Sequence, residues 1–155
     1  PSSARTSGTR SANGETSPDN TMTLLLDTHA ILWMTEQVPK LGRLARRSCD
    51  VALAAGELAI PTVVLFEIGW GLRRGLIEGP ADVRAWRNRI LSLGVREVGL
   101  SAEIAMTAVG LDDLHGDPFD RIIVATAMSE EAVLLTADRP LLAWSGQLSR
   151  QDARR

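Results

Sequence analysis

The sequence predicts a single α/β domain, a three-layer α/β/α sandwich with a central, mainly parallel sheet. Two observations along the chain predict it. Short runs of three or four apolar residues alternate with longer segments of helical periodicity, which is the order expected of parallel strands joined by helices. The runs are apolar at successive positions, as in strands that are covered on both faces. At 155 residues the chain has room for one domain with a substantial core.

The first half of the chain contains two predicted strands and three predicted helices. In order, they are a strand at 24–26, helices at 28–36 and 41–55, a strand at 58–60 and a helix at 62–74. Pro39 separates the first two helices, because proline cannot continue a helix. Gly56 and Gly75 end the second and third, since glycine is the usual residue just beyond a helix C-terminus.

The second half repeats the alternation. It contains a helix at 80–93, a strand at 95–98, a helix from 101, a loop at 115–119, a helix at 120–128 and a strand at 133–136. Pro80 and Asp82 are typical of a helix start, and Ser101 is a predicted N-cap. Ligands of such folds collect beyond the carboxyl ends of the strands, and two acids, Asp27 and Asp138, lie there in this prediction.

The predicted domain covers residues 22–150, between two segments that are expected to be disordered. Residues 1–21 contain only alanine as an apolar residue and are rich in Ser, Thr and Gly, so they cannot offset the entropy lost on ordering. We treat them as a leader or an added segment, with Met22 as a candidate native start. Residues 151–155 are expected to form a disordered tail.

Composition excludes several classes of protein. No apolar run approaches the length of a membrane span, and the single cysteine, Cys49, excludes an internal disulfide and suits a reducing compartment, which we take to be the cytoplasm. The net charge of −2 argues against coating nucleic acid by charge alone. It does not exclude a nuclease, which concentrates carboxylates at its centre and can carry basic groups at its rim.

Four acids stand out by their setting: Asp27, Glu67, Asp120 and Asp138. A parallel sheet would bring strand ends and helix starts to one edge, where carboxylates can share a hard cation such as Mg²⁺ or Mn²⁺. Each acid also has a structural explanation. Asp27 and Asp120 suit helix starts and Asp138 suits a turn, whereas Glu67 interrupts an apolar stretch and needs a partner or a metal there.

Four segments carry a resemblance to a known family. They are Leu24-Leu25-Leu26-Asp27-Thr28-His29, Glu67 within its helix, His115-Gly116-Asp117-Pro118-Phe119-Asp120-Arg121, and Leu134-Leu135-Thr136-Ala137-Asp138. In order and spacing they resemble the PIN-domain toxins called VapC, over about residues 23–142. The resemblance implies a PIN fold, RNA cleavage that depends on Mg²⁺ or Mn²⁺, and inhibition by a cognate VapB-like antitoxin.

The resemblance also assigns roles to residues. Asp27, Glu67, Asp120 and Asp138 match the family's catalytic acids, and Asp27 and Asp120 are the expected ligands of the principal metal. Asp117 is either a further metal-site acid or a helix cap. Thr28 either bonds within the site or caps its helix, with capping favoured, and Arg121 either contacts RNA phosphate or pairs with an acid, with pairing favoured.

Two matters stay open at this point. The chain is expected to form a homodimer through apolar side chains on helices, with Trp70, Leu72 and Trp86 as candidates that core packing explains equally well. The alternative functions are another PIN-type nuclease, acting on DNA or on a nucleic-acid structure, and a PIN-like scaffold that binds RNA or a partner without catalysis.

Overall fold

The computed structural model describes residues 21–155. Of the leader expected at 1–21, only Thr21 falls within these residues, and the rest lies outside them. Five strands form one sheet in the order β3-β2-β1-β4-β5, and every neighbouring pair is parallel. The strands are β1 (Leu24–Leu26), β2 (Leu58–Pro61), β3 (Arg96–Val98), β4 (Val133–Thr136) and β5 (Arg150–Asp152). The predicted parallel sheet is confirmed.

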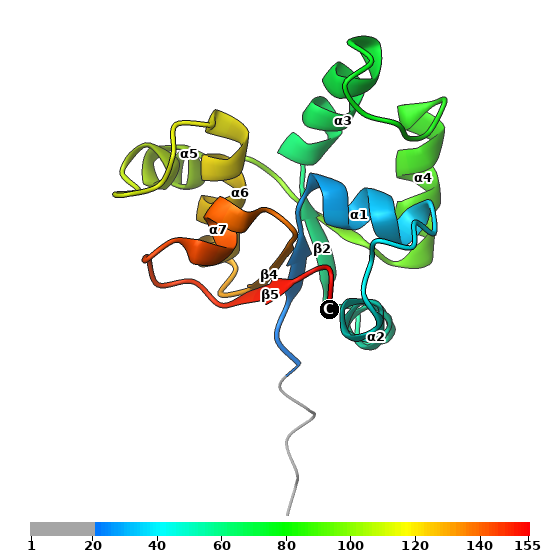
Figure 1. Ribbon diagram of the computed structural model, residues 1–155, viewed down its shortest axis with the longest axis horizontal. Helices are drawn as coiled ribbons and strands as arrows, with labels where there is room; N and C mark the ends of the chain where they lie inside the picture. Colours follow the sequence, from blue (N-terminus) through cyan, green and yellow to red (C-terminus); the bar gives the residue numbers. More distant parts are fainter. Residues whose placement is uncertain (1–20) are drawn as a thin grey trace, which may run out of the picture.

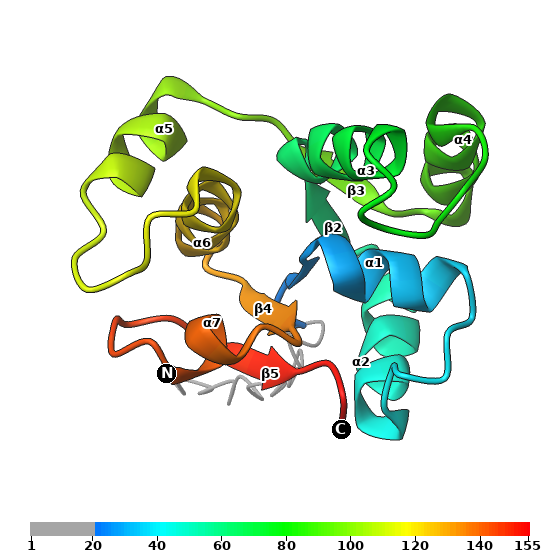
Figure 2. The ribbon, with the colours of Figure 1, turned by 45° about the horizontal axis from the view of Figure 1, so that its top comes forward.

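Helices cover both faces of the sheet and complete three layers (Figure 1). They are α1 (Thr28–Thr35), α2 (Arg43–Ala54), α3 (Val63–Arg73), α4 (Val83–Leu93), α5 (Ala102–Val109), α6 (Pro118–Ser129) and α7 (Arg139–Ala143). Helices α1 to α4 lie on one side of the strands and α5 to α7 on the other (Figures 1 and 2). This division follows from right-handed crossovers, because the chain moves along the sheet in one direction from β1 to β3 and in the opposite direction from β3 to β5.

The core forms where β1, β2 and β4 are enclosed by the helices. Leu25 pairs in register with Ala59 on one side and Leu134 on the other, and all three are fully buried. Trp86 is also buried, and its Nε1 donates a hydrogen bond to the Thr35 hydroxyl at 3.0 Å. Trp86 therefore belongs to the core and does not supply the exposed apolar surface that was considered for dimerisation.

The expectation of a disordered tail at 151–155 is wrong. Residues 150–152 form β5, an edge strand that pairs with β4. Beyond it Ala153 is fully buried, and the carbonyls of Ala153 and Arg155 accept hydrogen bonds from the Gly42 and Ala45 amides at 2.9 and 2.8 Å. A side chain at Gly42 would overlap the Arg155 backbone, so glycine permits this approach. The strand has no apolar run because its backbone pairing, rather than side-chain burial, holds it.

Between residues 21 and 155, no helix is long and apolar enough to cross a membrane.

Candidate active site

The four predicted acids gather at the carboxyl end of the sheet. Asp27 follows β1 and is the N-cap of α1, and Asp138 follows β4 and is the N-cap of α7. Asp120 lies in the first turn of α6, and Glu67 lies in α3, which contacts α6. Figure 2 shows α1, α3, α6 and α7 around this end of β1 and β4. The acids are far apart in sequence, and the parallel topology brings them together.

Asp27 is buried and held by hydrogen bonds at both carboxylate oxygens. Its side chain is 5% exposed. Oδ1 accepts from the Ala30 amide at 2.9 Å, and Oδ2 accepts from the Thr136 hydroxyl. Burial raises the pKa of Asp27 to about 6, although the hydrogen bonds from Thr136 and Ala30 oppose the rise. The carboxyl is therefore fixed in orientation and costly to keep charged without a nearby cation.

Thr136 connects Asp27 to Asp138. While its hydroxyl donates to Asp27, its Oγ1 accepts from the Asp138 amide at 3.0 Å. The Asp138 carboxylate in turn accepts from the Leu141 amide at 3.0 Å, which caps α7. No role was predicted for Thr136 from the sequence, although it lies within the motif that carries Asp138. Thr136 is a polar side chain in a buried strand, and that was the available signal.

Glu67 is oriented by Thr28. The Thr28 hydroxyl donates to Glu67 Oε1, and Thr28 is buried at the start of α1. The favoured expectation that Thr28 caps its helix is wrong, because Asp27 is the residue that caps it. Thr28 instead joins α1 to α3 within the site. This contact also meets the need for a partner that the apolar surroundings of Glu67 predicted.

Asp120 is affected by the charges of all the other acids of the site. Its pKa is raised to about 7, first by burial and then by the negative charges of four other acids, namely Asp117, Asp138, Glu67 and Asp27. His115 lies nearby, with its Nε2 3.4 Å from Asp120 Oδ2. The mutual repulsion shows that the predicted quartet shares one electrostatic environment, in which a cation would relieve the cost of ionisation.

Asp117 caps α6. Its Oδ1 accepts from the amides of Phe119 and Asp120 at 2.9 and 3.2 Å. The helix therefore begins at Pro118, two residues before the predicted start. Asp117 is exposed, yet its charge acts on Asp120. The geometry shows the capping role, and the alternative of a further metal-site acid stays a prediction.

Arg121 does not form the ion pair that the sequence favoured. Its guanidinium donates to backbone carbonyls of the segment before α6: those of Ala108, Val109, Leu111 and Leu114, at 2.7 to 3.0 Å, and that of His115 at 3.4 Å. No ion pair between Arg121 and an acid forms within residues 21–155. The expected acid pairing is wrong. Backbone carbonyls accept hydrogen bonds from all three guanidinium nitrogens, so Arg121 positions this loop, and its contact with RNA phosphate stays a prediction.

The residues present fit a hard divalent cation. In the described part of the chain no group of three or more His, Cys, Asp or Glu side chains is arranged so that it could hold a metal ion. Mg²⁺ does not need one, because it is usually held by one or two carboxylates and keeps several waters. Asp27 and Asp120 supply only oxygen donors, and burial and repulsion disfavour their charged forms. These are the properties of a site that is completed by a cation.

Comparison with known proteins now adds to this geometry. Residues 24–143 match the family model of the PIN domain. The chain belongs to the PIN-domain family. This PIN domain is 35% identical over 120 residues to ribonuclease VapC22 of Mycobacterium tuberculosis, an alignment that covers 77% of the chain and 89% of that relative. The resemblance to the VapC group is thereby confirmed.

Solved structures show the same fold. The PIN domain is similar to a chain of the VapBC2 complex of Rickettsia felis bound to a promoter DNA fragment, with a TM-score of 0.63 and 17% identity over 84% of this chain and 98% of that one. A chain of DNA-bound VapBC from Salmonella typhimurium gives a TM-score of 0.61 and 16% identity, with the same coverage. At these identities the likeness concerns the fold, and it confirms the predicted PIN-like sandwich.

Proposed function

We propose that this PIN domain is a metal-dependent endoribonuclease toxin that cleaves RNA phosphodiester bonds and is neutralised by a cognate VapB-like antitoxin. The observation that carries the proposal is the gathering of Asp27, Glu67, Asp120 and Asp138 at one edge of the sheet, in a chain related to a VapC ribonuclease. We also propose that it acts in the cytoplasm, where its RNA substrate is found.

Asp27 and Asp120 are the proposed ligands of Mg²⁺ or Mn²⁺, with Asp138 and Glu67 completing the site. When bound, such a cation polarises a phosphate and lowers the pKa of a coordinated water. The protein contributes orientation. Thr136 and the Ala30 amide hold both oxygens of Asp27, and Thr28 holds Glu67.

A proton must leave the water that attacks phosphorus. The carboxylates of Glu67 and Asp138 lie at the edge of the site and are only partly buried, so either can accept that proton and pass it to solvent. Asp27 is less suited to this step, because it is buried and both of its oxygens accept hydrogen bonds.

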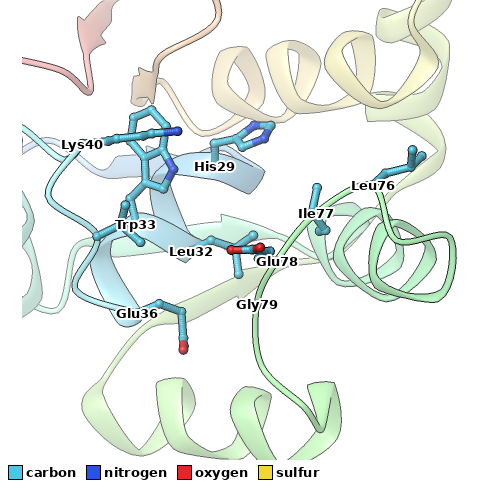
Figure 3. Close-up of a pocket in the computed structure, with 10 residues that line it drawn as sticks. His29, Leu32, Trp33, Glu36, Lys40, Leu76, Ile77, Glu78 and Gly79 are labelled. Atoms are coloured by element: carbon cyan, nitrogen blue, oxygen red, sulfur yellow. The ribbon is translucent and has the colours of Figure 1, made fainter.

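A groove beside α1 suits the arm of an antitoxin. A cavity of about 430 Å³ lies between α1 and the loop after α3, where Leu32, Trp33 and Ile77 provide apolar walls. The carboxylates of Glu36 and Glu78 also border it (Figure 3). Glu36 is paired with Arg89, and Lys40 also lines the cavity, so Glu78 is the acid left to attract a basic residue. Apolar walls with such an acid suit an apolar peptide that carries a basic residue. We therefore propose this groove as the antitoxin site.

A homodimer is also part of the proposal. Phe66 and Trp70 lie one turn apart on α3, are 58% and 48% exposed, and stack with ring centroids 6.1 Å apart. Exposed aromatic pairs of this kind are typical of protein interfaces. Sedimentation of the purified protein at several concentrations tests this, and a monomer throughout would contradict it.

Cleavage of total cellular RNA by the antitoxin-free protein tests the activity. With Mg²⁺ or Mn²⁺ we expect discrete fragments, and with EDTA we expect none. Asp27→Asn and Asp120→Asn should each abolish cleavage while the circular dichroism spectrum stays unchanged. Asp82→Asn is the matched control, because Asp82 caps α4 away from the site and asparagine caps equally well.

Two results would contradict the proposal. An Asp27→Asn, Asp120→Asn double variant that still cleaves RNA would exclude these acids from the chemistry. Cleavage of matched DNA but not of RNA would identify a different PIN-type nuclease. The antitoxin is tested by co-expressing the toxin with its operon neighbour. If the mass of the purified toxin stays unchanged, no complex has formed, and the result counts against that partner.

A further inference from the structure

A second groove opens beside Asp138 and is not used by the proposed mechanism. Its volume is about 700 Å³, and it is lined by His29, Trp33, Lys40, Ala137, Asp138 and Arg154. These residues come from three parts of the chain: helix α1 with the loop after it, the loop after β4, and the C-terminal segment. Asp138 gives the groove direct continuity with the acids of the active site.

The groove combines flat rings with positive charges. His29 and Trp33 lie one turn apart on α1, with ring centroids 6.2 Å apart. The Nζ atom of Lys40, the single lysine of the chain, is 5.9 Å from the centroid of the Trp33 ring. Figure 3 shows the Lys40 side chain beside the Trp33 indole, with His29 further along α1. Arg154 adds a second cation, and its Nε contacts Asp152 at 3.2 Å.

Charge distinguishes this groove from its neighbour. Both cavities share His29, Trp33 and Lys40, but the neighbour adds Glu36 and Glu78, whereas this groove adds Arg154. Glu36 is paired with Arg89, and the Nε of Arg154 with Asp152. Glu78 therefore disfavours an anionic strand in the neighbouring cavity, whereas Lys40 and the terminal nitrogens of Arg154 are the cations that could reach a phosphate in this groove. Asp138 is the one acid that lines the groove, and it lies at the end where the active site begins.

We propose that this groove binds an unpaired nucleotide of single-stranded RNA next to the scissile phosphate, with its base on Trp33 and its phosphates contacted by Lys40 and Arg154. The inference rests on the proposed function. Bases stack on aromatic side chains irrespective of sequence, and cations along a groove follow the phosphate backbone. The Lys40 ammonium exchanges its contact with the ring for a phosphate oxygen when the base takes its place.

Binding of a short, fluorescently labelled single-stranded RNA tests the inference. The protein carries Asp120→Asn to prevent cleavage, and the dissociation constant is measured by anisotropy at several salt concentrations. Lys40→Ala and Arg154→Ala should each weaken binding several-fold and reduce the slope of log K against log salt by about 0.7, the value for one lost phosphate contact with a single strand. Both side chains are exposed, so these variants should fold.

Trp33 is tested separately, because it packs partly against the core. Trp33→Ala should weaken binding roughly tenfold with little change in salt dependence, and Trp33→Phe should restore most of the loss. Arg84→Ala is the matched control for the cations. Arg84 is exposed on α4 and lines a different cavity, so its variant should bind RNA as the parent does.

Three outcomes would overturn the inference. Unchanged affinity and salt slope in both cation variants would exclude phosphate contacts in the groove. An equal loss of RNA affinity in Arg84→Ala would show that binding depends on the overall positive charge of the protein and not on a specific site. If the groove variants no longer bind the co-expressed antitoxin but still bind RNA, the groove is a protein-docking surface. If the parent protein cleaves no RNA but the groove variants still lose RNA binding, the proposed activity fails while this inference holds.

Discussion

The hydroxyl of Thr136 donates a hydrogen bond to the buried carboxylate of Asp27, across the pairing of β1 and β4. The same hydroxyl accepts from the Asp138 amide. One threonine thus holds two of the proposed catalytic acids in a fixed relation. It also provides the strongest of the hydrogen bonds that oppose the burial-driven rise in the pKa of Asp27.

Replacing Thr136 with valine should reduce both stability and activity. The substitution keeps the shape but leaves a buried Asp27 oxygen without a donor, which costs about 1–3 kcal/mol of the free energy of unfolding. The pKa of Asp27 should rise further, so the acid limb of the pH–rate profile should move to higher pH. Urea unfolding and cleavage rates from pH 5 to 8 measure both effects. Thr136→Ser should behave almost as the parent, and a fully active, equally stable Thr136→Val protein would refute the role.

The stability of the metal-free protein should fall as the pH rises. Asp27 and Asp120 have folded-state pKa values of about 6 and about 7, above the ordinary value of 3.8. The contribution of these two carboxyl groups to the free energy of unfolding is therefore complete below pH 4 and is lost as the pH rises through 6 to 7. In EDTA, the stability of the parent relative to Asp120→Asn should decline by roughly 2–4 kcal/mol between pH 4 and 8. A difference that does not change with pH would show that Asp120 is not perturbed.

Divalent cations should reverse this trend. Metal ligands must be deprotonated, so Mg²⁺ should stabilise the protein more at pH 8 than at pH 5. At a concentration one hundred times the dissociation constant, the gain in free energy of unfolding is about 2.7 kcal/mol. Thermal unfolding with and without Mg²⁺ measures it. Asp120→Asn should lose the gain and Asp82→Asn should keep it, whereas an equal gain in both would point to binding elsewhere.

The two alternatives for Asp117 can be separated by substitution. If it only caps α6, Asp117→Asn should cleave RNA at close to the parent rate, because asparagine caps as well as aspartate. Asp117→Ala should lose about 1 kcal/mol of stability. We expect this pattern. A loss of cleavage by more than tenfold in Asp117→Asn, at unchanged stability, would assign Asp117 to the metal site.

Arg121 should matter for stability rather than for RNA affinity. Its guanidinium donates hydrogen bonds to carbonyls at the end of α5 and in the loop between α5 and α6. Arg121→Met should leave several of them without a donor and cost about 2–4 kcal/mol by urea unfolding. The KM for RNA should stay within about threefold of the parent value, with Arg84→Ala as the control for a lost surface charge. A stable variant with a greatly raised KM would restore the phosphate-binding role.

Local patterns in the sequence predicted most of the fold. The strands around Leu25, Ala59 and Leu134 were found because strands buried on both faces must be apolar at successive positions. Parallel pairing then followed from the helices between them. The edge strand β5 was missed because strands were predicted from apolar runs, and β5 contains none. Gln151 and Asp152 are held by backbone pairing, and that pairing does not require apolar side chains.

The sequence by itself determined which acids belong together, since Asp27 and Asp138 follow strands and those strands end at one edge of the sheet. Only the tertiary structure decided what holds each acid in place. Thr136 contacts Asp27 across 109 positions of sequence and Thr28 contacts Glu67 across 39, and hydroxyl partners carry no periodic pattern. The same applies to Arg121, whose partners are backbone carbonyls. Such groups are present in every residue, so only the folded chain selects among them.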